Sequence, residues 1–206
     1  MKQDAATESR LVEAAERLFA ERGVGAVSLR AVMQAAGTNV AAVHYYFGSK
    51  DALVAAVVTS RIDAVTRSRS AILDALPAAE EISARELALA FIRPVLDVVE
   101  SGGSAWVRVI SHLLAGNDAA LAPISDTFFD RNADFVALLG RREPDLPAST
   151  ISFRLAQAMT LTLQVLGDVD RVGSLMGGAE QPWSPDQVVD QLVGVVAAVL
   201  AGPPHQ

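Results

Sequence analysis

The sequence predicts an all-α protein, with a three-helix helix-turn-helix domain over residues 1–53 and a helical bundle over residues 54–206. Apolar residues recur at helical spacing along the chain, and no segment alternates apolar and polar residues as a half-buried strand does. Serine caps mark the starts of helices, and glycines and prolines mark their ends. Because 51% of the 206 residues are hydrophobic, the chain can bury a sizeable core.

The first helix is expected over residues 7–22, with Gly23 as its stop. Its apolar face carries Leu11, Ala15, Leu18 and Phe19. Its solvated face is expected to carry Glu13, Glu16, Arg17 and Glu21. An isolated pair of short helices has too little core to fold alone, so this first helix is expected to brace the two that follow.

Residues 28–47 predict two short helices joined by a tight turn. Ser28 is a good N-cap for the first helix, and Gly37 can end it in a left-handed conformation. The apolar face of this helix carries Leu29, Val32, Met33 and Ala36. Asn39 can cap the second helix, which is expected to run to about Tyr46.

The second of these helices has a distinct inner and outer face. Val43 and Phe47 are one turn apart and are expected to pack inward. The outer face is expected to carry Val40, Ala41, His44 and Tyr45. Periodicity alone fits a DNA-reading helix-turn-helix and two ordinary core helices equally well.

A long connecting helix is expected over residues 49–76, capped by Ser49 and ended by Pro77. Lys50 lies in its first turn, where a positive charge is unfavourable beside the positive end of the helix dipole. Lys50 therefore either has a task outside the helix or is an ordinary surface lysine.

Further helices are expected over residues 83–100, 106–116, 119–141 and 149–171. Pro94 should kink the first of these, and Gly102 and Gly103 should end it. Pro144 and Pro147 mark a loop, and residues 173–178 are expected to form a mobile glycine-rich loop. Ser184-Pro185-Asp186 is a strong start for a last helix, which Gly202 should end.

The last helix is apolar around most of its circumference, far more than one core-facing stripe needs. Its apolar residues are Val188, Val189, Leu192, Val193, Val195, Val196, Val199 and Leu200. A central helix buried within one chain would explain this. The interpretation favoured here is a homodimer in which each subunit contributes its last two helices to a four-helix interface.

Charge and composition limit where the protein acts. The net charge is −7, but residues 1–60 hold six basic and six acidic residues, so the acidic excess lies in the remainder. A neutral N-terminal region on an acidic body would bind DNA through a few placed groups. The chain has no cysteine, and neither a signal peptide nor an apolar bilayer-spanning stretch is evident. We therefore expect a cytoplasmic protein without membrane attachment.

No catalytic or metal-binding constellation is evident, so an enzyme is not expected and no cofactor is expected either. His44, His112 and His205 are far apart in the sequence. Bulky apolar groups and isolated polar groups of the body could instead line a ligand cavity. The candidates are Trp106, Arg108, His112, Phe128, Phe135, Met159, Thr162 and Gln164.

The stretch AGTNVAAVHYYFGSKDAL resembles the signature of the tetracycline-repressor (TetR-type) family, in which Ala-Gly leads into a recognition helix that ends in an aromatic pair, Phe and then Lys. The resemblance runs in order from about Leu11 to Leu53, and beyond Leu53 it is one of architecture only. Two positions depart from the family pattern: His44 stands where a tyrosine is usual, and Tyr46 where a histidine is usual. These departures could change the preferred DNA sequence.

The resemblance implies a set of DNA-binding residues. They are Ser28, Arg30, Thr38, Asn39, Val40, Ala41, His44, Tyr45, Tyr46 and Lys50. By resemblance and position, Ser28, Thr38, Tyr46 and Lys50 would hold phosphates. Arg30, Val40, Ala41, His44 and Tyr45 would face base edges.

The sequence thus predicts a dimeric, ligand-responsive transcriptional regulator, a repressor released from a palindromic operator by a small, largely apolar effector. Activation in place of repression is the main alternative. An all-α enzyme or lipid carrier, and an adaptor that binds another protein through its acidic body, are the remaining rivals.

Overall fold

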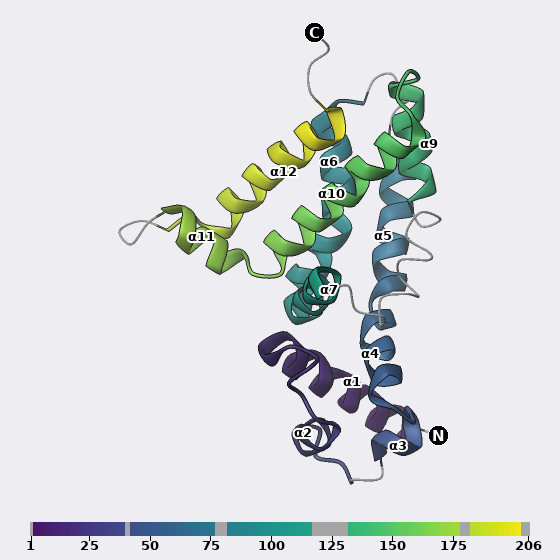
Figure 1. The fold of residues 1–206 in the computed structure, drawn as a ribbon, viewed down its shortest axis with the longest axis vertical. Helices are drawn as coiled ribbons and strands as arrows, with labels where there is room; N and C mark the ends of the chain where they lie inside the picture. The colour runs from purple at the N-terminus through teal and green to yellow at the C-terminus, as the bar shows by residue number, and fades with distance from the viewer. Residues whose placement is uncertain (1, 40–41, 77–81, 117–131, 178–181, 203–206) are drawn as a thin grey trace.

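The computed structural model describes residues 2–39, 42–76, 82–116, 132–177 and 182–202, and all regular structure in these ranges is helical (Figure 1). The elements are α1 (Lys2–Arg22), α2 (Leu29–Ala35), α3 (Ala42–Tyr46), α4 (Lys50–Thr59), α5 (Ile62–Asp74), α6 (Ala84–Val98), the π-helical turn η1 (Val99–Gly103), α7 (Ser104–Gly116), α9 (Ala133–Arg142), α10 (Ala148–Leu166), α11 (Val169–Gly177) and α12 (Pro185–Ala201). The predicted all-α class is confirmed.

The helices form two groups joined by α4 and α7 (Figure 1). At one end of the molecule α1 packs against α2 and α4. At the other end α12 packs against α6 and α10, and α5 packs along α6. Helix α7 lies between the groups, because it contacts both α1 and α10. The N-terminal helices therefore rest directly on the body as well as being tethered to it.

The described parts of the helix-turn-helix agree with the prediction. The Ser28 side chain accepts a hydrogen bond from the Ala31 amide at 3.2 Å and caps α2. Gly37 has φ +62°, the left-handed conformation that ends the helix. Val43 is fully buried, and Phe47 packs against the core. The predicted start of the second helix at Asn39 adjoins residues 40–41, which lie outside the described residues.

One face of α1 differs from the prediction. Glu16, expected on the solvated face, is only 7% exposed. It lies within 3.5 Å of the Arg61 guanidinium. A carboxylate is buried only when a partner compensates for its lost hydration, and Arg61 is brought to Glu16 by the tertiary fold.

The connecting helix is also not continuous. The expected helix over residues 49–76 is two helices, α4 and α5, with a break at Ser60 and Arg61. At the break the Ser60 hydroxyl donates to the Val57 carbonyl at 2.7 Å. The Trp106 indole N–H donates to the carbonyls of Val57 and Val58 at 2.9 and 3.1 Å. Side chains thus donate hydrogen bonds to carbonyls that would accept from backbone amides in a continuous helix.

Helix α6 begins with a capping box and runs through Pro94 as one α-helix. The break between α6 and α7 comes in η1, where Gly102 has φ +86°, as the glycine pair predicted. Of the helix expected over residues 119–141, residues 119–131 lie outside the described residues. Helix α9 covers the remainder and extends one residue further.

The capping box of α6 predicts a pH-dependent contribution to stability. Glu86 is exposed, and its pKa lies below the ordinary value of 4.5 because the Ser83 side chain and backbone N–H hydrogen-bond its carboxylate. Since the folded-state pKa is the lower one, this contribution is present above pH 4.5 and is lost as pH falls through the folded-state pKa.

We therefore expect Glu86→Ala to lower the free energy of unfolding at neutral pH and to cost less at acidic pH. Urea unfolding across this pH range measures the difference. Gln187 closes the corresponding capping box of α12 without a charge, so Gln187→Ala is a matched control whose cost should not change with pH. A cost of Glu86→Ala that stays constant with pH would contradict the prediction.

The region between α10 and α12 differs from the prediction. The helix expected over residues 149–171 ends at Leu166, and the residues expected to form a glycine-rich loop are helical up to Gly177. A side chain at Gly167 would lie 2.9 Å from the Leu163 carbonyl oxygen and 3.2 Å from the Cα atom of Arg108 in α7. A side chain at Gly173 would lie 2.4 Å from the Trp183 carbonyl oxygen. Both glycines therefore allow close backbone contacts, Gly167 in the turn between α10 and α11 and Gly173 within α11.

The last helix starts and ends as predicted. Ser184 forms a capping box with Gln187, and Gly202 follows the last turn with φ +75°. The Arg154 guanidinium of α10 donates to the carbonyls of Leu200 and Ala201 at 3.1 and 3.0 Å. A positive group on the last carbonyls of a helix also complements its dipole, so α10 holds the end of α12 in place.

Candidate DNA-binding surface and effector domain

The predicted recognition helix presents its polar groups to solvent. Val43 anchors α3 in the core, whereas His44 and Tyr45 on the same helix are exposed. Tyr45 is 79% exposed, so its ring and hydroxyl are both accessible to a partner. Arg30 on α2 is exposed as well. Val40 and Ala41 lie outside the described residues.

The aromatic residues of α3 support one another. The Tyr45 and Tyr46 rings meet edge to face, with centroids 4.9 Å apart. Tyr46 is half-buried, and its ring lies 6.4 Å from that of Phe47, which packs against the core. This series of rings restrains the exposed Tyr45 side chain, which lowers the entropy lost when it binds a partner.

The geometry assigns a tautomer to His44. Its Nδ1 atom lies 3.2 Å from the Gly48 carbonyl oxygen. A carbonyl oxygen can only accept, so Nδ1 carries a proton, and Nε2 is the acceptor whenever the ring is neutral. An exposed acceptor suits the amino group of adenine or cytosine in the major groove.

The predicted phosphate-binding residues lie at or near helix starts. Ser28 caps α2, and Lys50 is the first residue of α4, which Ser49 caps. The Thr38 hydroxyl donates to the Met33 carbonyl at 3.3 Å, so its oxygen can still accept. Asn39 is exposed. The structure thus places the described candidates at the surface or partly exposed, and their contact with DNA stays a prediction.

The candidate ligand-binding residues have different surroundings. Phe135 and Thr162 are fully buried, and the Thr162 hydroxyl donates to the Ala158 carbonyl. The Trp106 N–H is already paired with carbonyls of α4. The others are placed as follows: His112 and Gln164 are exposed, Arg108 and Met159 are half-buried, and Phe128 lies outside the described residues.

Arg108 already has partners within the chain. Its guanidinium donates to the Gly167 carbonyl at 3.0 Å and lies 3.4 Å from the Asp168 carboxylate. These contacts tie α7 to the end of α10. A role of the candidate set in ligand binding stays a prediction.

A buried polar cluster that the sequence analysis missed lies in the body. Arg69 of α5 is 6% exposed and donates to the Asn132 side-chain oxygen at 2.9 Å. Its guanidinium carbon lies 5.6 Å from the Phe91 ring centroid and 5.8 Å from that of Phe135. The signal was present in the sequence, because Arg69 falls at helical spacing on the partly buried face of α5 that includes Val65 and Ile72.

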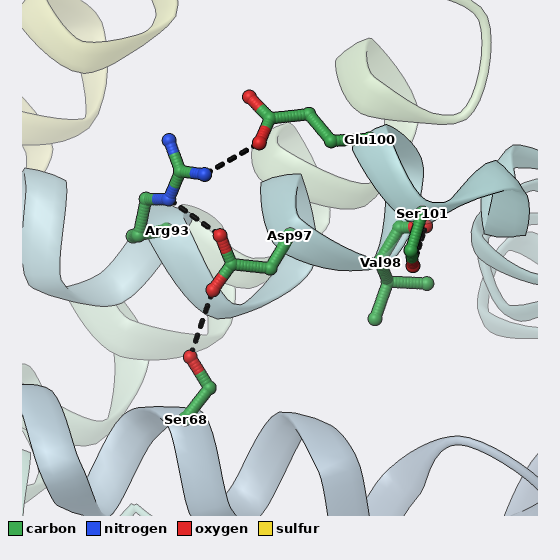
Figure 2. Close-up of polar contacts among 6 residues, drawn as sticks. All are labelled: Ser68, Arg93, Asp97, Val98, Glu100 and Ser101. Atoms are coloured by element: carbon green, nitrogen blue, oxygen red, sulfur yellow. Dashed lines mark hydrogen bonds and ion pairs between the residues drawn. The ribbon is translucent and has the colours of Figure 1, made fainter.

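A second polar network holds α6 to α5 (Figure 2). Arg93 pairs with Asp97 and Glu100, each at 2.5 Å, and the Ser68 hydroxyl of α5 donates to Asp97 at 2.9 Å. Burial alone would lower the pKa of Arg93, but the hydrogen bonds and charges of Asp97 and Glu100 outweigh it and raise the pKa. Arg93 is therefore a permanent cation with a structural role beside η1.

Within the described ranges, no three His, Asp or Glu side chains gather as metal ligands would. In the same ranges no helix combines the length and apolar character needed to cross a bilayer.

Two family models match the chain. The model for bacterial regulatory proteins of the tetR family matches residues 11–57, and the model for the tetracyclin repressor-like C-terminal domain matches residues 89–199. The chain belongs to the TetR family. The family resemblance expected from the sequence is thus confirmed, and this TetR-family protein is a DNA-binding transcriptional regulator.

Solved structures of TetR-type fold resemble this protein over nearly its whole length. A TetR family transcription regulator from Marinobacter aquaeolei has 16% identity and a TM-score of 0.66, with 97% of this chain and 98% of that chain covered. A candidate fatty acid metabolism regulator from Clostridium perfringens has 14% identity and a TM-score of 0.66, with 96% and 100% covered. A candidate TetR-family regulator from Mesorhizobium loti has 15% identity and a TM-score of 0.57, with 96% of each chain covered. A comparison with curated proteins found no match.

Proposed function

We propose that this TetR-family regulator is a homodimeric repressor that binds a palindromic operator in the cytoplasm and is released by a small, largely apolar effector. In this proposal residues 1–53 read DNA, and residues 54–206 bind the effector and dimerise. The observation that carries the DNA-reading role is the exposed Tyr45 and His44 on a helix whose inner face is fixed by Val43. A surface aromatic supported by neighbouring rings is suited to a macromolecular partner.

The dimer is proposed to form through α10 and α12. These two helices pack against each other, and each leaves uncharged residues exposed. On α12 the exposed positions Gln191, Gly194, Val195 and Ala198 share one helical face. On α10, Phe153 is 65% exposed. Two helices from each subunit, facing across a two-fold axis, would bury these residues in a four-helix interface.

The dimer would hold its two recognition helices about 34 Å apart, in successive major grooves. An effector in the body would release DNA only if it binds more tightly to a form in which this separation is wrong. Because effector and operator would then favour different forms, effector binding would release the repressor from DNA.

The experiment that tests the proposal is selection of bound duplexes from a random DNA pool, followed by affinity measurement at several salt concentrations. We expect the parent to enrich a palindrome. The double variant Tyr45→Ala, Lys50→Ala should weaken binding by about 1–3 kcal/mol for each lost base contact. It should also reduce the slope of the logarithm of affinity against the logarithm of salt concentration by about one for each lost phosphate contact.

Arg141→Ala is the matched control, because it removes an exposed positive charge from α9 in the body. This control should keep the parent's affinity for the selected duplex. A parent that enriches no duplex at any salt concentration would defeat the proposal. Equal binding by the parent and the double variant would show that DNA is bound elsewhere.

A further inference from the structure

The break between α4 and α5 lies where the N-terminal helices, the connector and the body meet. Helix α4 ends at Thr59 and α5 begins at Ile62. In a continuous helix the amides of Arg61 and Ile62 would donate to the carbonyls of Val57 and Val58. In this described stretch neither amide makes that bond, and the Trp106 indole N–H donates to both carbonyls.

Nothing in the local sequence requires this break. Residues 49–76 contain neither glycine nor proline, and their pattern predicts one helix. The break is therefore imposed by the tertiary structure, through Trp106 of α7 and the Ser60 hydroxyl. Removing these donors would let the carbonyls bond to the backbone amides in their place. The segment thus has two hydrogen-bonding arrangements available to it, one broken and one continuous.

Arg61 links this break to the N-terminal helices. Its guanidinium lies 3.5 Å from Glu16 of α1, which is buried. It also lies against η1, where a side chain at Gly103 would come within 3.1 Å of the guanidinium carbon. The Arg61 Nε atom is buried without a hydrogen-bond partner. Arg61 is half-buried, and an ion pair that leaves one guanidinium nitrogen unpaired adds little stability, so the present arrangement is held weakly at this point.

We propose that residues 57–62 form a switch, broken when Trp106 is in place and continuous when it withdraws, and that this switch sets the angle of the DNA-binding helices relative to the body. This inference rests on the proposed function and names its regulation. Movement of α7 would withdraw Trp106 from α4, and α7 also contacts α1 and α10. Straightening the connector would then shift the DNA-binding helices and change the separation of the two recognition helices.

The test replaces Trp106 by Phe, which keeps an aromatic ring and removes the N–H donor. The full-length protein is measured by residue-resolved amide hydrogen exchange and by affinity for the operator selected by the parent. Trp183→Phe makes the same chemical change outside the junction and is the matched control. We expect Trp106→Phe to slow exchange of the Arg61 and Ile62 amides at least about tenfold, because these amides gain backbone acceptors. Operator affinity should fall at least about tenfold, and Trp183→Phe should change neither quantity.

A variant that had merely lost packing would exchange faster throughout, so slower exchange confined to this site is specific to the switch. Unchanged or faster exchange at Arg61 and Ile62 would overturn the proposal. Slower exchange with unchanged operator affinity would overturn its regulatory part. If the parent binds no operator, the proposed function and the regulatory part fail together, and the exchange rates still decide whether the switch exists.

A second variant guards against misfolding of Trp106→Phe. Ser60→Ala removes the hydroxyl that donates to Val57 and introduces the residue with the highest helix propensity. It should slow exchange at Arg61 and Ile62 in the same direction, and faster exchange in this variant would also count against the switch.

Discussion

Val195→Glu is expected to separate the proposed homodimer into monomers and to reduce operator affinity about a thousandfold, toward the level of non-specific binding. Val195 is 50% exposed on α12, and the open space beside Gly194 lets a partner backbone approach closely. A carboxylate at this position would lose hydration on dimerisation without gaining a partner, and the two-fold axis would place its symmetry mate nearby. A monomer would then bind only one half-site.

Sedimentation velocity measures the oligomeric state, and fluorescence anisotropy with the selected duplex measures the affinity. Leu114→Glu is the control, because Leu114 is also an apolar residue partly exposed at 40%, but it lies on α7 outside the proposed interface. This control should remain a dimer. If Val195→Glu stays dimeric with the parent's affinity, the subunits meet through another surface.

Features determined by local interactions could be predicted from the sequence. Ser28, Ser49 and Ser184 each cap the helix that was assigned to them, because capping needs only the first turn of the helix that follows. Gly37 takes up the left-handed conformation for an equally local reason. Val43 could be assigned to the core from its spacing along a short amphipathic helix.

Features imposed by distant parts of the chain could not be predicted. The connector is broken because Trp106, 49 residues beyond Val57, donates to it. Glu16 has a polar side chain on a face that otherwise looked solvated, and its burial depends on Arg61. Gly173 looked like a loop residue because propensity disfavours glycine in helices, whereas its lack of a side chain allows the Trp183 backbone to approach.

The candidate site residues also fall into two groups, those placed by the period of one helix and those placed by contacts between helices. His44 and Tyr45 could be placed at the surface from the period of one helix, and the structure finds both exposed. The ligand-binding candidates depended on which helices of the body meet, which the period of a single helix does not specify. The burial of Arg69 does not follow from its residue type, because arginine is usually solvated, although its spacing places it among apolar residues of α5.

Phe91→Ala is expected to lower the free energy of unfolding by about 3–5 kcal/mol, the usual cost of truncating a buried phenylalanine. Phe91 is fully buried on α6, and its ring meets that of Phe135 from α9 edge to face at 5.2 Å. The Arg69 guanidinium of α5 lies over the same ring. One substitution therefore removes apolar burial, an aromatic pair and a cation–π contact that join three helices.

Urea unfolding of the two variants measures this cost. Leu89→Ala is the control on the same helix, because Leu89 is 44% exposed and its truncation should cost much less. If Phe91→Ala costs no more than Leu89→Ala, then α5, α6 and α9 do not depend on this packing for their stability. A large cost would combine lost burial with lost ring contacts, because Phe91→Ala leaves the Arg69 cation beside the new cavity. Refilling the cavity with Phe91→Leu should then recover part of the burial but neither the aromatic pair nor the cation–π contact, which separates burial from the two ring contacts.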